Sequence, residues 1–264
     1  MFKNKKGEYI MLNKKNALFH GAASEVITPF AENGSVAYDL LAKEIDYLVE
    51  HGVTGFFVNG LASEALVLTK KEREECAGIV YEACRGRVPL MGNIIANSVG
   101  EGIEMAKVYD KIGYNAIIIT PPPVYKYTQE GIFEFFNSIA ASTKLPAYIY
   151  NAPETGNKLS PAMIARLFEA NGQFMGYKDS TQNIIEQQTL IGLIGKERHF
   201  ELLAGSDAQI VTTAMLGGSG GISLITVVFP ELIVECLKAC EEGNWEQAIE
   251  LQQRILKVRE ALKC

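Results

Sequence analysis

A lysine ends a short apolar stretch, Phe174-Met175-Gly176-Tyr177-Lys178, that has the length and composition of a buried strand. Burial of a lysine disfavours the ammonium and lowers its pKa, so that the amine becomes a nucleophile. The position alone favours a lysine that reaches solvent along its stem or pairs with a carboxylate over a catalytic one. Further features of the sequence have to decide between these interpretations.

A tyrosine ends a second stretch of this kind, Ala147 to Tyr150, and a lysine and a tyrosine together suit carbonyl chemistry. The amine attacks a ketone to form an imine, and the protonated imine withdraws electrons from the adjacent carbon. Making or breaking the next carbon–carbon bond then needs one proton-transfer group, which a tyrosine hydroxyl can supply. Because this chemistry needs neither a metal nor an organic cofactor, we predict none.

Short β-rich segments alternate with amphipathic helical segments from residue 20 onward, and eight such pairs are predicted. The predicted strands are 21–28, 55–59, 88–93, 115–120, 147–150, 174–178, 201–204 and 221–223. The predicted helices are 40–50, 70–84, 101–111, 131–142, 161–170, 183–194, 208–216 and 231–241, with one more at 245–263. Eight β/α units at about 25-residue spacing predict an α/β protein with a closed (β/α)8 TIM barrel and a short C-terminal helical extension.

Three regions are expected along the chain. Residues 1–18 are predicted to be an N-terminal tail, residues 19–242 the catalytic barrel and residues 243–264 a C-terminal helix that packs outside the barrel or on a neighbour. Barrel enzymes place their chemistry on the loops at the carboxyl ends of the strands. Lys178 and Tyr150 end adjacent strands and are therefore expected to approach one ligand.

Composition narrows the partners and the compartment. A net charge of −6 without a basic stripe disfavours nucleic acid and anionic membranes as partners. No apolar run approaches the roughly 20 residues that a membrane span needs. The chain has five cysteines without a C-x-x-C pair, which predict reduced thiols and a cytoplasmic protein: Cys76, Cys84, Cys236, Cys240 and Cys264. Its three histidines, His20, His51 and His199, lack the spacing of metal ligands, so no metal site is predicted.

Several ordered motifs resemble those of the dihydrodipicolinate synthase and N-acetylneuraminate lyase family of class I aldolases, over residues 20–262. Tyr150-Asn151-Ala152-Pro153 resembles its Y-N-x-P, and Gly176-Tyr177-Lys178-Asp179-Ser180 resembles its G-x-K-[DE]-[AS]. The resemblance implies that Lys178 forms a Schiff base with a 2-oxo acid and that Tyr150 is the proton shuttle. It also implies a homo-oligomer, a tetramer or a dimer, and substrate contacts from Leu61, Ala62, Ser63, Tyr125, Gly205 and Ile222.

The sequence departs from the family at three substrate loops and at its end. Gly60-Leu61-Ala62-Ser63-Glu64 stands where the family has G-[TS]-T-G-E, so a hydroxyl pair is lost. Pro153-Glu154-Thr155-Gly156 lacks the arginine that the synthase uses for the carboxylate of its aldehyde, and Pro123-Val124-Tyr125 replaces a pair of tyrosines. The C-terminal helical region is also shorter.

These departures favour one function over two others. We expect a Schiff-base lyase or aldolase that cleaves or forms a carbon–carbon bond of a 2-oxo acid and releases pyruvate, with a 2-keto-3-deoxy sugar acid or a sialic-acid-like substrate. Its partners would be a small 2-oxo acid and an aldehyde. The first alternative is a 4-hydroxy-tetrahydrodipicolinate synthase with an altered carboxylate site, and the second is a non-catalytic homologue that binds 2-oxo acids.

Overall fold

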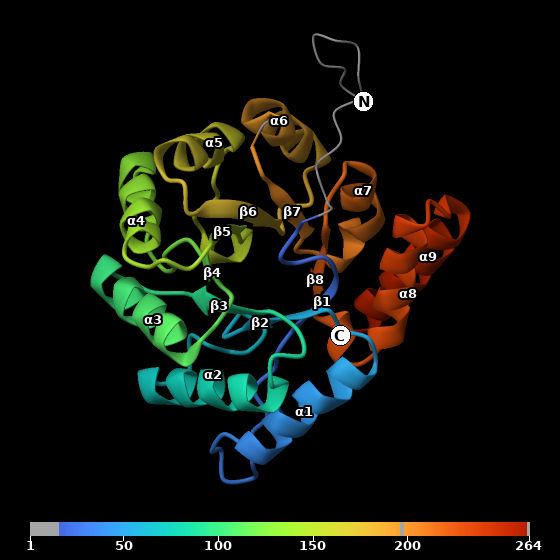
Figure 1. Ribbon diagram of the computed structural model, residues 1–264, viewed down its shortest axis with the longest axis horizontal. Coiled ribbons are helices and arrows are strands. Elements are labelled where there is room, and N and C mark those ends of the chain that lie inside the picture. The colour runs from blue at the N-terminus through green and yellow to red at the C-terminus, as the bar shows by residue number, and fades with distance from the viewer. Residues whose placement is uncertain (1–15, 196–197, 263–264) are drawn as a thin grey trace.

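The computed structural model describes residues 16–195 and 198–262, whose eight parallel strands close into a barrel in sequence order (Figure 1). The predicted TIM barrel is therefore confirmed. The strands are β1 (Gly21–Glu25), β2 (Gly55–Val58), β3 (Leu90–Ile94), β4 (Ala116–Ile119), β5 (Ala147–Asn151), β6 (Phe174–Asp179), β7 (Glu201–Ala204) and β8 (Gly220–Ser223).

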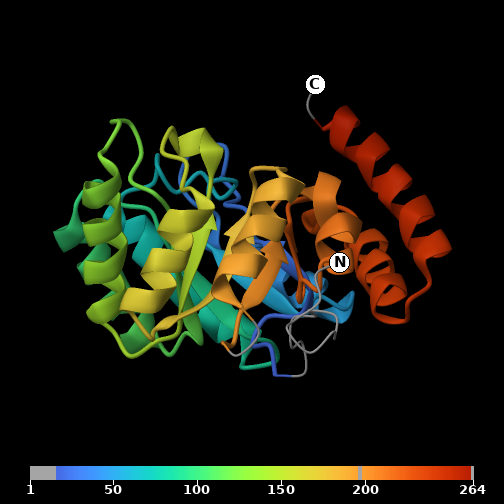
Figure 2. The ribbon, with the colours of Figure 1, turned by 90° about the horizontal axis from the view of Figure 1, so that it is seen from above.

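Helices surround the barrel, and apolar side chains from both layers fill the space between them. The α-helices are α1 (Tyr38–Glu50), α2 (Lys70–Cys84), α3 (Val99–Ile112), α4 (Gln129–Ala141), α5 (Pro161–Ala170), α6 (Ile184–Ile194), α7 (Ile210–Met215), α8 (Pro230–Glu241) and α9 (Trp245–Ala261). Three short 3-10 helices are η1 (Pro153–Thr155), η2 (Asp207–Gln209) and η3 (Ile225–Val227). Figure 2 shows α9 outside the barrel, alongside α8.

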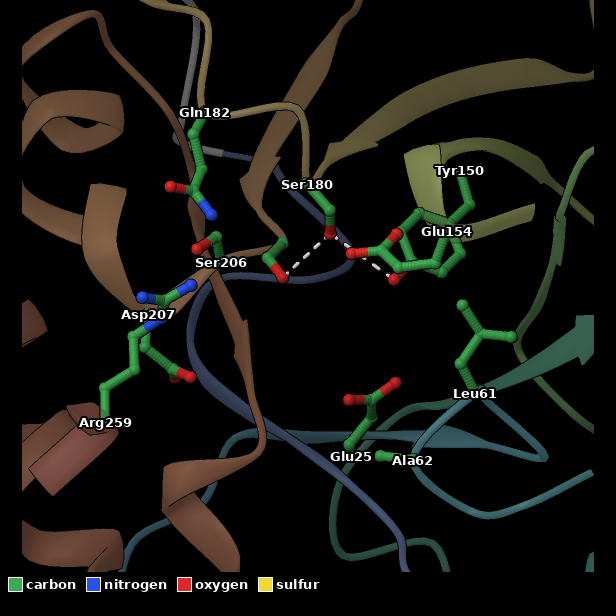
Figure 3. Close-up of a pocket in the computed structure, with 11 residues that line it drawn as sticks. Glu25, Leu61, Ala62, Tyr150, Glu154, Ser180, Gln182, Ser206, Asp207 and Arg259 are labelled. Carbon is green, nitrogen blue, oxygen red and sulfur yellow. Dashed lines mark hydrogen bonds between the residues drawn. The ribbon is translucent and has the colours of Figure 1, made fainter. Parts of the chain in front are cut away.

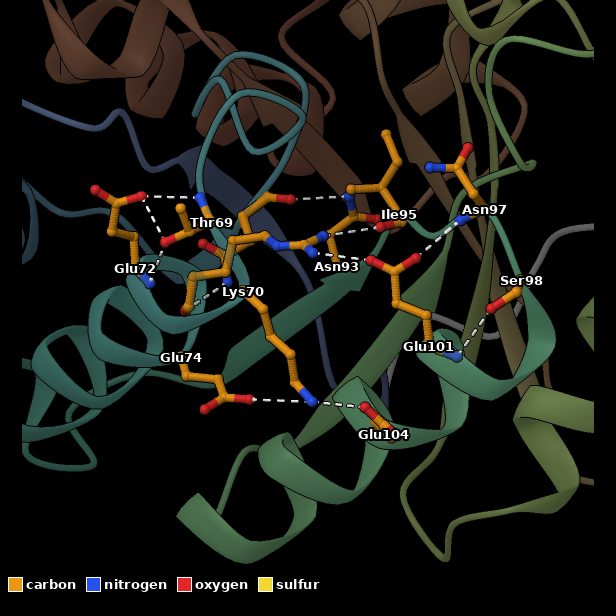
Figure 4. A network of polar contacts seen from close by, with 12 residues as sticks. Thr69, Lys70, Glu72, Glu74, Asn93, Ile95, Asn97, Ser98, Glu101 and Glu104 are labelled. Carbon is orange, nitrogen blue, oxygen red and sulfur yellow. Dashed lines mark hydrogen bonds and ion pairs between the residues drawn. The ribbon is translucent and has the colours of Figure 1, made fainter.

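The start of α2 is fixed by a capping box at Thr69. Thr69 accepts a hydrogen bond from the Glu72 N–H, and the Glu72 carboxylate accepts one from the Thr69 N–H, so both N-terminal donors have partners. Lys70 then bridges to Glu104 on α3, with 2.5 Å between Nζ and Oε2 (Figure 4). The cap thus marks the start of α2, and the exposed ion pair joins α2 to α3.

Buried amides connect the carboxyl ends of β2, β3 and β4. Asn59 donates to Tyr109 Oη at 2.9 Å, and Asn93 donates to the Asn59 carbonyl at 2.9 Å. Thr120 in turn donates to Asn93 Oδ1 at 2.6 Å. Because buried polar groups are costly without partners, these bonds hold the rim in one arrangement.

The first strand is shorter than predicted. It ends at Glu25 rather than Thr28, because the Ile27 N–H leaves the ladder and donates to Glu44 Oε1 on α1 at 3.1 Å. The predicted helix 208–216 likewise begins as the 3-10 turn η2, where Ser206 accepts a hydrogen bond from the Ala208 N–H. Both differences lie at the rim where the candidate site forms.

The amino end of the barrel is closed by a buried carboxylate. Glu201 accepts hydrogen bonds from the Leu18 and Phe19 N–H groups, at 2.8 and 3.1 Å, and from the Tyr148 hydroxyl at 2.6 Å. Residues 18 and 19 are thus tied to the barrel, whereas residues 1–15 of the predicted tail lie outside the described residues. No helix in the described part of the chain is long and apolar enough to cross a membrane.

Glu44 is expected to make the stability of the fold pH-dependent. Burial raises the pKa of Glu44 to about 7, although its hydrogen bond from Ile27 opposes this. Between pH 4.5 and 7 the folded state therefore holds a proton that the unfolded state releases, so stability is greatest below this window and falls as pH rises through it. The loss amounts to up to about 3 kcal/mol.

The amide in Glu44→Gln mimics the protonated carboxyl, so this variant should lose less stability on going from pH 5 to pH 8 than the wild type. Urea unfolding at the two pH values measures the difference. Glu50→Gln, at the exposed end of the same helix, is the control. An equal pH dependence in the wild type and Glu44→Gln would contradict the prediction.

Candidate active site

Four inward-pointing side chains meet at the carboxyl end of the barrel. Tyr150 and Lys178 are register partners on β5 and β6, and Glu25 and Phe57 are register partners on β1 and β2. Alternation along each strand turns all four toward the barrel axis. The Phe57 and Tyr150 rings meet edge to face, with 5.8 Å between their centroids.

Lys178 lies among the other three. Its Nζ is 3.9 Å from the centroid of Phe57, 4.0 Å from that of Tyr150 and 3.5 Å from Glu25 Oε1. The lysine is 1% exposed, so the possibility that it extends into solvent is wrong. Two aromatic faces and a carboxylate are surroundings that stabilise an ammonium.

The pKa of Lys178 moves in the direction opposite to that predicted from burial. Burial alone lowers the pKa, but the Glu25 carboxylate and the Tyr150 phenol outweigh it, so that the pKa is raised above its ordinary value. At neutral pH the lysine is therefore an ammonium in an ion pair. It must lose a proton before it can attack a carbonyl.

Tyr150 is held as a neutral phenol. Burial raises its pKa, and the nearby Lys178 charge only partly opposes this. Its hydroxyl shares a 3.3 Å hydrogen bond with Ser180 Oγ, which donates to the Gly205 carbonyl at 2.9 Å. A phenol that keeps its proton at neutral pH can act as a proton donor.

A pocket of about 220 Å³ opens above this group (Figure 3). Glu25 and Tyr150 line it, and Lys178 lies just behind them. Figure 3 shows that one side carries Gln182, Ser206, Asp207 and Arg259, while Leu61 and Glu154 lie on the other. Asp207 accepts a hydrogen bond from Ser223, and burial raises its pKa although Ser223 and Arg259 oppose the shift.

The sequence pattern of the dihydrodipicolinate synthetase family matches residues 18–264. The chain belongs to this family. It is 32% identical over 247 residues to the 4-hydroxy-tetrahydrodipicolinate synthase of Kosmotoga olearia, covering 93% of this chain and 83% of that protein. It is also 32% identical over 249 residues to the 4-hydroxy-tetrahydrodipicolinate synthase of Rhizobium meliloti, again covering 93% of this chain and 83% of that protein.

Solved structures of the dihydrodipicolinate synthetase family share the architecture. The dihydrodipicolinate synthase of Aquifex aeolicus superposes with a TM-score of 0.88 at 26% identity, covering 92% of this chain and 83% of that one. YagE from Escherichia coli K12, a prophage protein of the family solved with pyruvate, superposes with a TM-score of 0.88 at 29% identity, covering 92% of this chain and 83% of that one. The prediction of an enzyme of the Schiff-base aldolase and lyase class, acting on a small molecule, is thereby confirmed.

The predicted family residues are only partly brought together. Leu61, Ala62 and Gly205 line the pocket with Tyr150, whereas Ile222 is buried in the barrel below it. Tyr125 is 70% exposed and outside the pocket lining.

Ser63 is also outside that lining. Its hydroxyl donates to the Val26 carbonyl at 2.5 Å and accepts from the Gly60 N–H at 2.9 Å. The Ser63 hydroxyl and the Gly60 N–H are thus bonded to each other in the loop that the family resemblance assigns to the substrate carboxylate.

Four charged residues that line the pocket are absent from the predicted site, namely Glu25, Glu154, Asp207 and Arg259. Glu25 was predicted to lie inside a longer first strand, and Arg259 was predicted to lie on a helix outside the barrel. A glutamate in a strand of otherwise small or apolar residues was a signal of the same kind as Lys178. Arg259 gave no such signal, because its place depends on how α9 docks: Gln252 donates to the Asp207 carbonyl at 2.8 Å and accepts from the Val211 N–H at 3.1 Å.

Proposed function

We propose that this chain is a class I lyase that cleaves or forms a carbon–carbon bond of a 2-oxo acid, with pyruvate as the smaller fragment. Lys178 is the nucleophile and Tyr150 is the proton shuttle. The observation that supports this most strongly is a fully buried lysine whose Nζ lies 4.0 Å from the Tyr150 ring, directly behind the pocket. A purely structural ion pair would not need to lie beside an open pocket.

The reaction follows from these groups. The Lys178 amine adds to the 2-oxo carbon and water leaves, which gives a protonated imine. In the cleavage direction the substrate hydroxyl on C4 loses its proton, the bond between C3 and C4 breaks, and the imine nitrogen receives the electron pair as an enamine forms. The aldehyde leaves, the hydroxyl proton is relayed through Tyr150 to the enamine carbon, and hydrolysis of the resulting imine releases pyruvate.

The pocket lining favours a hydroxylated substrate over an aldehyde with its own carboxylate. Ser180, Gln182 and Ser206 offer hydrogen bonds to hydroxyl groups. Glu154 lines the pocket in the loop where the resemblance expects an arginine, and a carboxylate there would repel an anionic aldehyde. A 2-keto-3-deoxy sugar acid or a sialic-acid-like compound therefore suits the site better than aspartate semialdehyde.

One experiment separates the function classes. The protein is incubated with pyruvate, reduced with borohydride and weighed, and the adduct is mapped by peptide mass spectrometry. We expect one reduced pyruvate adduct per chain, on Lys178. The absence of an adduct with pyruvate and with every other 2-oxo acid tried would rule out the aldolase function, and an adduct without turnover of any aldehyde would favour the binding homologue.

The synthase remains the second candidate, because similar proteins carry that name at 32% identity. Turnover of pyruvate with aspartate semialdehyde, compared with a panel of sugar aldehydes, chooses between the two. The homo-oligomer and the cytoplasmic location stay predictions. One similar solved structure is described as a monomeric dihydrodipicolinate synthase variant, so light scattering on the purified chain should measure the assembly directly.

Arg259 is expected to hold the anionic group of the substrate. It is the one positively charged side chain among the described residues that line the pocket. Hydrogen bonds to charged groups contribute about 1.5–3 kcal/mol, so Arg259→Gln should raise KM about 10- to 100-fold with little change in kcat. Steady-state kinetics measure this, with Arg254→Gln on an exposed position of the same helix as the control. An unchanged KM would assign Arg259 to the docking of α9 alone.

A further inference from the structure

Glu25 is a carboxylate in a place that few carboxylates occupy. It is 8% exposed and ends β1, and its Oε1 lies 3.5 Å from Lys178 Nζ. The same oxygen packs against the backbone of Gly60, where an added Cβ would lie 2.6 Å from it. Glu25 therefore touches both the nucleophile and the loop that begins the pocket wall.

The resting site poses a problem of proton transfer. Lys178 is an ammonium, and an ammonium has no electron pair with which to attack a carbonyl. A base must take one proton when the substrate arrives, and an acid must later protonate the hydroxyl that leaves as water. The base has to reach the nitrogen, and the acid has to reach the hydroxyl on the carbon bonded to it, so one group beside the nitrogen can serve both steps.

Only a few ionisable groups face Lys178 among the described residues. Tyr150 is a phenol with a raised pKa, so in the resting site it already holds its own proton and does not take the one on Lys178. Asp207 is close enough to feel the charge of Lys178, but it accepts a hydrogen bond from Ser223 and faces Arg259. Glu154 influences Tyr150 from an exposed loop. Glu25 is the carboxylate at ion-pair distance from the nitrogen.

We propose that Glu25 takes the proton from the Lys178 ammonium when a carbonyl substrate arrives and returns it to the hydroxyl that leaves as water. This inference rests on the proposed function of the chain. Proton transfer converts the ion pair into a neutral amine and a neutral carboxylic acid. The amine then forms a bond to the carbonyl carbon, and the carbonyl oxygen becomes the hydroxyl of a carbinolamine after the nitrogen gives up a second proton to it.

Dehydration uses the proton stored on Glu25. The carboxylic acid protonates the carbinolamine hydroxyl, the carbon–oxygen bond breaks, and the nitrogen electron pair forms the carbon–nitrogen double bond. One water molecule leaves, and the products are a protonated imine on Lys178 and a carboxylate on Glu25. The charges at the end equal those at the start, so no external acid or base is consumed.

The transfer also removes an obstacle to an anionic substrate. A charged Glu25 beside Gly60 would repel a carboxylate near this wall, because two carboxylates in one buried site do not readily both stay ionised. A protonated Glu25 is neutral and can donate a hydrogen bond to that carboxylate. Binding of a 2-oxo acid and release of the lysine amine are therefore linked through one proton.

The test compares rates of imine formation. Pyruvate is the probe, cyanoborohydride traps the imine on Lys178, and intact mass follows the adduct with time between pH 6 and 9. The variants are Glu25→Gln, which keeps the size of the side chain but cannot carry the proton, and Glu25→Asp, which keeps a carboxylate. Glu32→Gln, an exposed carboxylate after the same strand, is the matched control. Circular dichroism establishes that each variant is folded.

We expect Glu25→Gln to form the adduct about 10²-fold more slowly than the wild type at pH 7. Its rate should rise roughly tenfold per pH unit, because the free amine then arises only by loss of a proton to solvent. Glu25→Asp should keep the shallow pH profile of the wild type at a reduced rate, which decides the question if Glu25→Gln does not fold.

A role for Glu25 as a counter-ion alone predicts the opposite sign. Removal of the carboxylate would then lower the Lys178 pKa, leave more neutral amine at pH 7 and speed the adduct. A rate in Glu25→Gln equal to or above that of the wild type would overturn the inference while leaving the proposed function intact. No adduct in the wild type with any 2-oxo acid would overturn both.

Discussion

Replacement of Lys178 by arginine is expected to abolish the borohydride-trapped adduct and to lower turnover by about 10⁴-fold or more. In the wild type the Lys178 ammonium lies 3.5 Å from Glu25. The guanidinium keeps a positive charge at this position, so Glu25 is not left without a cation. It cannot act as the nucleophile, because arginine stays protonated at all ordinary pH values. Intact mass after reduction and steady-state turnover measure the two effects.

A second variant separates chemistry from stability at this position. Lys178→Met also removes the amine, but it leaves Glu25 buried without its cation. Its free energy of unfolding, measured by urea denaturation, should therefore be about 3–5 kcal/mol lower than that of the wild type. Lys158→Ala removes an exposed lysine and should leave the adduct unchanged. An adduct that survives in Lys178→Arg at the wild-type level would show that another lysine is the nucleophile.

Tyr150→Phe is expected to lower turnover by about 10²- to 10³-fold while the adduct with pyruvate still forms. The phenylalanine ring keeps the packing on Phe57 and on the Lys178 ammonium, so the variant should remain folded. Only the hydroxyl that shares a bond with Ser180 is lost. In the proposed scheme this hydroxyl moves the proton of the bond-breaking step, whereas Glu25 serves the formation of the imine.

Single-turnover measurements distinguish the two steps. Trapping with cyanoborohydride reports the imine, and release of the aldehyde reports the cleavage. Tyr81→Phe removes a hydroxyl from a partly exposed tyrosine on α2 and serves as the control. A turnover in Tyr150→Phe within twofold of the wild type would remove Tyr150 from the proton path.

The barrel was predictable because most strands are short and apolar and several helices carry their own boundary signals. β7 and α5 match their predicted bounds, and the latter begins at Ser160-Pro161, a cap followed by proline. β1 was predicted too long, because the Glu44 carboxylate on α1 takes the Ile27 N–H. Such a side-chain partner arises only when two elements pack, so no local pattern indicates it.

The proximity of Lys178 and Tyr150 was predictable from the sequence, but the electrostatics around them were not. Lys178 and Tyr150 end neighbouring strands, and parallel pairing brings them together. The direction of the lysine pKa was predicted wrongly, because burial was considered without the carboxylate that burial brings near. Glu25 is 153 residues away along the chain, and only closure of the barrel places it beside the lysine.

Arg259 belongs to a different part of the molecule from Lys178 and Tyr150, the residues proposed to carry the chemistry. The buried face of α9 packs in a separate hydrophobic cluster with α7 and α8, which includes Leu251 and Ile255, whereas Tyr150 and Phe57 belong to the cluster inside the barrel. A change on that face of α9 moves the arginine without passing through the strands that hold Lys178. Substitutions on the buried face of α9 are therefore expected to alter the position of Arg259 while the strands around Lys178 keep their arrangement.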